Sequence, residues 1–192
     1  MDETDEQLVS LSLTGDAAAF GILFQRHGPV VHSYLARRVG RQEADDLLSE
    51  VWLRAFRGRA GLRGSNSLPW LFGIAHNVVS AHWRRGNRPA LPLPLHDAPD
   101  PWPDTDDRLV AQAQQESIRR ALAILSDNDR DVLLLVVWEQ LTPSEAASAL
   151  GLPQGTARSR LHRALSTLRQ EGADNSPILI GSHFKEEDDG HT

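Results

Sequence analysis

Six prolines lie in the segment from Asn87 to Asp107, and they constrain the fold of this 192-residue chain more than any other feature. A proline has no backbone N–H and disfavours the helical conformation in the residue before it. A helix interior is therefore excluded here, and we predict an extended linker over residues 89–107. The linker separates residues 1–88 from a second part that begins at residue 108.

Apolar residues on both sides of this linker recur at helical spacing, and the alternation typical of strands is missing. The first part predicts a bundle of about four helices around Leu8 to Leu11, Phe20 to Leu35, Leu47 to Ala55 and Leu71 to Val79. The second part predicts helices over residues 109–125, 132–138, 143–150 and about 154–168. The expected fold class is all-α, with two small helical domains.

The sharpest local signal is a helix-turn-helix in the second part. Thr142 and Glu145 form a capping-box pattern, and Pro143 occupies the first helical position between them. Gly151 supplies the left-handed residue that ends this short helix, and an amphipathic helix follows after a tight turn. Residues 108–170 are therefore predicted to form a domain that ends in a helix-turn-helix.

The last predicted helix is cationic. No acidic residue occurs between Gln154 and Gln170, whereas four arginines do: Arg158, Arg160, Arg163 and Arg169. Its predicted buried stripe consists of Ala157, Leu161, Ala164, Leu165 and Leu168. Arg reads guanine edges in the DNA major groove, so this pattern indicates DNA binding. An ordinary helical hairpin with a solvated arginine face fits the same spacing.

The net charge of −6 does not contradict a nucleic-acid partner, because the acidic residues are concentrated outside the predicted domains. Residues 1–88 and residues 118–170 each carry a net charge of +2. The connecting segment and the tail over residues 171–192 hold the excess of acidic residues, and we expect that tail to be mostly disordered.

Composition and motifs exclude several other classes of protein. The chain has no cysteine, so disulfides and thiolate metal sites are excluded, and no apolar run approaches the length needed to span a membrane. We find no Gly-rich phosphate loop and no convincing Ser/His/Asp or metal set. We therefore expect a cytoplasmic protein that is not an enzyme, has no cofactor or metal, and does not insert into membranes.

Three stretches resemble extracytoplasmic-function (ECF) sigma factors of the sigma-70 family. Residues 121–168, which include GTARSRLHRAL, are similar to region 4 of that family. The stretch ADDLLSEVWLRAF at residues 44–56 resembles region 2.2, and PWLFGIAHNVVSAHWRR at residues 69–85 resembles regions 2.3 and 2.4. The motifs occur in the family's order, and together they cover almost everything from about Gln7 to Gln170.

The resemblance assigns roles to individual residues. Region 4 would bind the −35 promoter element through Thr156, Arg158, Ser159, His162 and Arg163. Regions 2.3 and 2.4 would bind the −10 element through Arg63, Asn66, His76, Asn77, Arg84 and Arg85. Region 2.2 would dock on the polymerase through Asp45, Asp46, Leu48, Glu50 and Trp52. These carboxylates also fit a plain solvated helix face, and Trp70 fits a core position better than a base contact.

The sequence departs from the family at Gly73 and His76, where many members carry arginine. The resemblance predicts a sigma factor that binds core RNA polymerase through its β′ and β subunits, recognises promoter DNA, and is held inactive by an anti-sigma protein. The alternative is a conventional helix-turn-helix regulator that binds an operator without polymerase. That alternative predicts tight operator binding by the isolated protein.

Overall fold

The computed structural model describes residues 3–62, 64–86 and 116–170. Every regular element in these ranges is helical, which confirms the predicted all-α class. The elements are α1 (Asp5–Leu13), α2 (Ala17–Val39), α3 (Arg41–Gly58), the 3₁₀ turn η1 (Arg59–Gly61), α4 (Leu68–Arg84), a helix over residues 116–123, α6 (Asp127–Val137), α7 (Pro143–Leu150) and α8 (Gln154–Gln170). The predicted linker, the predicted tail and Arg63 lie outside the described residues.

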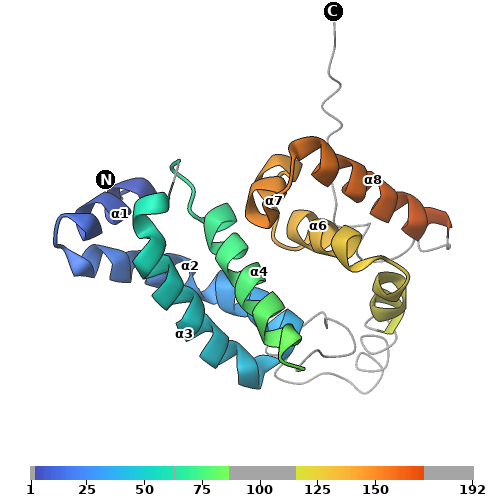
Figure 1. Ribbon diagram of the computed structural model, residues 1–192, viewed down its shortest axis with the longest axis horizontal. Helices are drawn as coiled ribbons and strands as arrows, with labels where there is room; N and C mark the ends of the chain where they lie inside the picture. Colours follow the sequence, from blue (N-terminus) through green and yellow to red (C-terminus); the bar gives the residue numbers. More distant parts are fainter. Residues whose placement is uncertain (1–2, 63, 87–115, 171–192) are drawn as a thin grey trace, which may run out of the picture.

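The N-terminal unit is the predicted bundle of four helices, α1 to α4 (Figure 1). Its helix starts are specified locally: Thr4 and Gln7 form a reciprocal capping box at α1, and the Asp16 carboxylate caps α2. Leu23, Val51 and Leu71 from three different helices are fully buried between them. The apolar stripes that predicted the helices therefore meet in one core.

A buried carboxylate ties α1 to the start of α4. Asp5 Oδ2 accepts hydrogen bonds from the Ser67 hydroxyl at 2.6 Å and the Ser67 backbone N–H at 3.2 Å, and lies 2.7 Å from His27 Nε2. Asp5 Oδ1 accepts a bond from Arg26 Nη1 at 2.6 Å. These hydrogen bonds satisfy an orphan donor at the N-terminus of α4 and fix where that helix begins.

The C-terminal unit contains the predicted helix-turn-helix: α7 has its predicted bounds, and α8 ends at Gln170, two residues later than predicted. Thr142 and Glu145 form the capping box of α7, and Gly151 ends the helix with φ 64° and ψ 34°. The preceding helix, α6, begins five residues earlier than predicted, at Asp127, because Ser126 caps it by accepting from the Asp129 backbone N–H. The sequence prediction followed apolar residues alone and missed this polar first turn.

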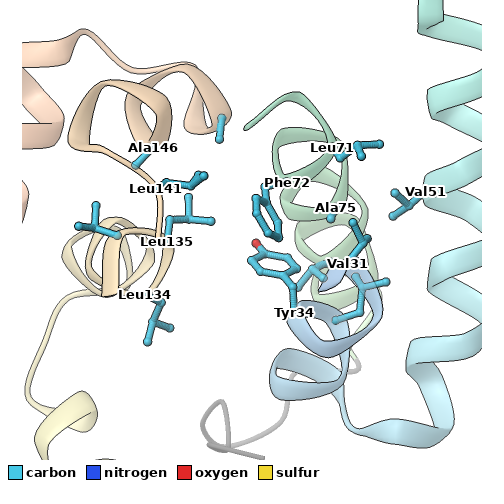
Figure 2. Packing of buried hydrophobic residues seen from close by; sticks show 14 of the residues in the cluster. Val31, Tyr34, Val51, Leu71, Phe72, Ala75, Leu134, Leu135, Leu141 and Ala146 are labelled. Carbon is cyan, nitrogen blue, oxygen red and sulfur yellow. The ribbon is translucent and has the colours of Figure 1, made fainter. Parts of the chain in front are cut away.

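The two units contact each other where α4 packs on α7 (Figure 1), and Arg38 of α2 pairs with Asp131 of α6. Figure 2 shows Tyr34 and Phe72 on the flank of the N-terminal unit that faces Leu135 and Leu141. Both aromatic residues are fully buried. Burial raises the pKa of the Tyr34 hydroxyl far above its ordinary value, so this side chain is neutral in the interface.

Candidate nucleic-acid interface

The recognition helix α8 presents the side chains that the sequence predicts on its outer face. Ala157, Leu161, Ala164 and Leu168 are buried, while Leu165 from the predicted stripe is only half-buried. Gln154 Nε2 donates to Ser144 Oγ at 2.8 Å, which links the start of α8 to the start of α7. This contact and the buried stripe set the angle of the helix-turn-helix.

Among the predicted −35 residues, Arg158, Ser159 and His162 are exposed, and Thr156 is half-buried. Successive exposed residues of one helix can follow the edges of successive bases in a major groove. The geometry therefore supports a nucleic-acid contact at this face.

Arg163 differs from Arg158 because it has a carboxylate partner outside its own helix. Its Nη1 donates to both carboxylate oxygens of Asp129, at 3.1 and 3.3 Å. The Asp129 side chain is only 7% exposed, whereas that of Arg163 is 63% exposed. The guanidinium is thus anchored at one nitrogen with most of its surface in solvent. Asp129 lies 34 positions away in sequence, so scanning α8 for acidic residues did not reveal this pair.

The predicted −10 residues are spread along α4 and do not form a compact cluster. Asn66 precedes the first turn and Arg84 ends the helix, and 16 steps of helix between Leu68 and Arg84 span roughly 24 Å. Asn77, Arg84 and Arg85 are exposed. Asn66 is exposed but already bonded, because its Nδ2 donates to Glu145 Oε1 of α7 at 3.2 Å.

His76 lies against the C-terminal unit, with Nδ1 3.9 Å from Asp131 Oδ2. Burial lowers the pKa of the His76 imidazole below its ordinary value of 6.5, Asp131 opposes that shift, and Arg38 adds to it. His76 is therefore mainly neutral near pH 7 and adds no full positive charge to this face of α4. Its imidazole ring is oriented toward Asp131 of the C-terminal unit.

On α3, the predicted polymerase-binding residues divide into an exposed group and a buried one. Asp45 and Asp46 are exposed, and Asp45 Oδ1 lies 3.1 Å from His32 Nε2. Glu50 is partly exposed and paired at 2.5 Å with Arg54, while Leu48 is half-buried. The carboxylates of the two aspartates thus provide the accessible negative charge of this face.

Trp52 does not lie on that accessible face. It is only 7% exposed and packs edge-on against Phe20 and Phe24, with ring centroids 5.8 and 5.1 Å apart. Its position in the structure is therefore a core position of the N-terminal unit. The sequence reasoning did not single out Phe24, which remains 45% exposed beside it.

The search for metal and membrane features covers only the described parts of the chain. Within them, no group of three or more His, Asp or Glu side chains is placed to hold a metal ion. No described helix is both long and apolar enough to cross a membrane.

Comparison with known families identifies both units. The family described as Sigma-70 region 2 matches residues 23–89, and Sigma-70, region 4 matches residues 115–168. The ECF RNA polymerase sigma factor RpoE of Cereibacter sphaeroides is 36% identical over 165 residues, which covers 81% of this chain and 87% of that protein. SigD of Mycobacterium tuberculosis is 32% identical over 177 residues, covering 86% and 82% of the two chains.

Two solved structures share the fold. CnrH, solved in complex with the cytosolic domain of CnrY, aligns with a TM-score of 0.65 at 22% identity, over 91% of this chain and 100% of that one. The sigma factor RpoE from Bartonella quintana, solved with the anti-sigma factor NepR, aligns with a TM-score of 0.58 at 22% identity, over 79% of this chain and 94% of that one.

The paired helical units and the two matched regions define a sigma-70-type transcription initiation factor. More specifically, the chain belongs to the ECF RNA polymerase sigma factors. It is therefore a polymerase-binding sigma factor that directs promoter-specific transcription. This membership decides between the two functions that the sequence left open, in favour of the sigma factor.

Proposed function

We propose that the outer face of α8 binds the −35 element, with Arg158 as its principal base-reading side chain. The observation that carries this assignment is the exposed cationic surface of α8, the helix that follows the capped α7 in the helix-turn-helix. Thr156, Ser159, His162 and Arg163 surround Arg158 and supply phosphate or base contacts. In this division of the chain, residues 108–170 form the −35 domain, residues 1–88 form the −10 and polymerase domain, and residues 89–107 connect them in the sequence.

For the −10 element, we propose single-strand capture by α4 and the loop before it. Unstacked bases need cationic groups for their phosphates and amide or flat side chains for their edges. Asn66 and Asn77 supply amides, whereas Arg63, Arg84 and Arg85 supply charge. His76 completes the proposed set, although it is half-buried and lies 3.9 Å from Asp131 of α6.

For core polymerase with its β′ and β subunits, we propose docking of the acidic face of α3 on a basic surface of the β′ subunit. Asp45, Asp46 and Glu50 provide the charge, and Leu48 provides apolar area beside it. The structure supports an indirect part for Trp52, which packs behind this face. The polymerase supplies all the chemistry, so we assign this chain no catalytic activity and no cofactor.

We also propose regulation by an anti-sigma protein, because one solved neighbour is a sigma factor bound to an anti-sigma factor and the other is bound to the cytosolic domain of a partner protein. Polymerase and promoter DNA reside in the bacterial cytoplasm, which is where this chain would act. Run-off transcription with core polymerase and genomic DNA, with and without this protein, tests the proposal as a whole. New start sites that depend on the protein support it, and identical transcripts in both reactions contradict it.

Replacing Arg158 with Ala should lower promoter-dependent transcription about five- to 150-fold. A side chain that reads a base typically contributes ~1–3 kcal/mol, and each 1.4 kcal/mol is a factor of ten. The measurement is run-off transcription together with footprinting of the −35 element. Arg169→Ala removes the same charge from the last turn of α8, outside the proposed contact, and should change transcription less than about twofold.

Arg163→Ala should affect both DNA binding and stability, whereas Arg158→Ala should affect DNA binding alone. The Arg163 variant should reduce transcription as Arg158→Ala does, but it should also lower the melting temperature, because Asp129 loses its charge partner while remaining buried. Equal transcription by wild type, Arg158→Ala and Arg163→Ala would remove both side chains from −35 recognition.

Reversing two charges on α3, Asp46→Arg with Glu50→Arg, should weaken binding to core polymerase about tenfold or more at low salt. Rim charges act mainly through attraction at a distance, so the loss should shrink as ionic strength rises. Co-purification and fluorescence anisotropy with labelled protein measure it. The matched control reverses Glu6 and Glu116, which are exposed and outside the proposed surface. Unchanged co-purification of the α3 variant contradicts the docking site.

A further inference from the structure

Asp129 is a buried acidic residue in the first turn of α6 that contacts the exposed side of α8. Its side chain is 7% exposed, and its carboxylate accepts a hydrogen bond from the Arg163 guanidinium of α8. The helices α6 and α8 pack against each other within the C-terminal unit (Figure 1). The pair therefore joins the interior of this unit to the side chains proposed to contact the −35 element.

The Asp129 carboxylate is held in place from its own helix. Ser126 Oγ donates to Asp129 Oδ2 at 2.8 Å and accepts from the Asp129 backbone N–H at 3.2 Å. Ser126 is also the N-cap residue of α6, and a negative charge in the first turn of a helix is favourable. The start of α6 thus fixes the position of this carboxylate independently of Arg163.

Both oxygens of the carboxylate bind a single nitrogen of Arg163. Nη1 donates to Oδ1 at 3.1 Å and to Oδ2 at 3.3 Å. An arginine that serves only to tie a carboxylate commonly uses two nitrogens, one for each oxygen. Here the N–H groups of Nε and Nη2 have no partner in the described parts of the chain, on a side chain that is 63% exposed.

The two remaining nitrogens match the edge of a base. Nε–H and one N–H of Nη2 point in parallel from the planar guanidinium. Guanine presents O6 and N7 side by side in the major groove, and an arginine bonded to both is the commonest specific contact there. Ser159 lies one helical turn before Arg163 on the same exposed side of α8. Arg163 is therefore on the face assigned to the −35 element above.

We propose that Asp129 is a positioning residue for −35 recognition, which holds the Arg163 guanidinium by Nη1 so that Nε and Nη2 read a guanine. This proposal rests on the −35 assignment of α8 made above. A free arginine loses conformational freedom when it binds a base, whereas Arg163 has lost part of that freedom on folding. The negative charge of Asp129 also opposes a phosphate close to the guanidinium, which favours a base edge over the DNA backbone.

The test measures base preference at each position of the −35 element. Holoenzyme assembled from core polymerase and full-length variants transcribes a promoter mapped by run-off transcription, together with derivatives in which each −35 base pair is replaced in turn. Arg163→Ala shows at which position Arg163 acts. Asp129→Asn removes the charge but keeps the shape of the side chain, and its backbone N–H can still bond to Ser126.

Three further variants separate positioning from stability. Asp127→Asn removes a charge from the same turn of α6, on a side chain that is 57% exposed. Val132→Ala removes buried apolar volume from α6 and lowers the stability. Both should leave the ranking of the promoters unchanged. Arg163→Lys keeps a positive charge for Asp129 but lacks the planar fork, so it should retain the stability and lose the base preference.

Wild type should prefer one base pair about five- to 150-fold at the position where Arg163→Ala abolishes the preference. Asp129→Asn should lower that preference about three- to tenfold at the same position and less than about twofold elsewhere. In the Arg163→Ala background, Asp129→Asn should have no further effect on base preference, because the two side chains act as one unit.

Three results for Asp129→Asn overturn the positioning role: an unchanged preference, an equal loss on every promoter, and a sharper preference. If Arg158→Ala changes a base preference but Arg163→Ala changes none, the −35 assignment stands and the positioning role is wrong. If neither arginine variant changes a base preference, the −35 assignment itself has failed, and the positioning role fails with it.

Discussion

Asp5→Ala should lower the free energy of unfolding by about 3 kcal/mol or more, a large share of the stability of a small domain. The Asp5 carboxylate is 5% exposed and is shared by the Ser67 N–H and hydroxyl, His27 and Arg26. Its removal leaves these groups buried or partly buried without their acceptor. Urea denaturation followed by circular dichroism measures the loss. Glu6→Ala is the control, because Glu6 is the exposed neighbouring carboxylate of the same helical turn.

The Asp5 contribution should also depend on pH in a defined direction. Burial alone would raise the pKa of Asp5, but hydrogen bonds from Ser67 and Arg26 outweigh it, so the folded-state pKa lies below the ordinary value of 3.8. A carboxyl with a depressed pKa stabilises the fold fully above its unfolded-state value. That contribution is lost as the pH falls through the lower, folded-state value. The stability gap between wild type and Asp5→Ala should hold at neutral pH and close below about pH 4; a gap that stays constant contradicts this account.

Trp52→Ala should lower the free energy of unfolding by about 3–5 kcal/mol, as is usual when a large buried aromatic side chain is removed. The indole packs between Phe20 and Phe24, so its loss leaves a cavity in the N-terminal unit. Leu53→Ala removes a neighbouring apolar side chain that is 48% exposed and should cost less than about 1 kcal/mol. Thermal and urea unfolding measure both.

The Trp52→Ala variant distinguishes a role of Trp52 in the core from a direct contact with the polymerase. Trp52→Phe keeps an aromatic ring in the cluster and should restore most of the stability and nearly all of the polymerase binding. A Trp52→Ala protein with wild-type stability but no affinity for polymerase would instead place the indole in the docking surface.

The helix-turn-helix shows which structural features can be predicted from the sequence. The bounds of α7 agree with the prediction because its signals are local: Thr142 bonds to Glu145 three residues away, and Gly151 adopts a left-handed conformation by itself. The buried stripe of α8 follows from helical periodicity in the same way. Within the C-terminal unit, α6 begins earlier than predicted, since its first turn carries polar residues with a Ser126 cap.

The candidate sites were predicted less completely than the helices. Residue types and helix faces placed Arg158 and Asp46 on exposed surfaces, as found. The same reasoning could not show that Trp52 points inward, because an amphipathic helix has flanks where burial depends on its neighbours. Nor could it show that Asn66 and His76 face another unit.

The sequence by itself determined the helical class, the two units and the capped recognition motif, and it carried the family resemblance that the comparisons confirmed. These properties depend on residues three or four positions apart, or on which side of a helix is apolar. Tertiary structure alone decided the partners of Asp5, Arg163 and Arg37. Arg37 and Glu139 are 102 positions apart, and such a pair forms only after the helices that carry it have packed. Charges have no spacing rule at that range, so ion pairs between distant helices became visible only in the folded molecule.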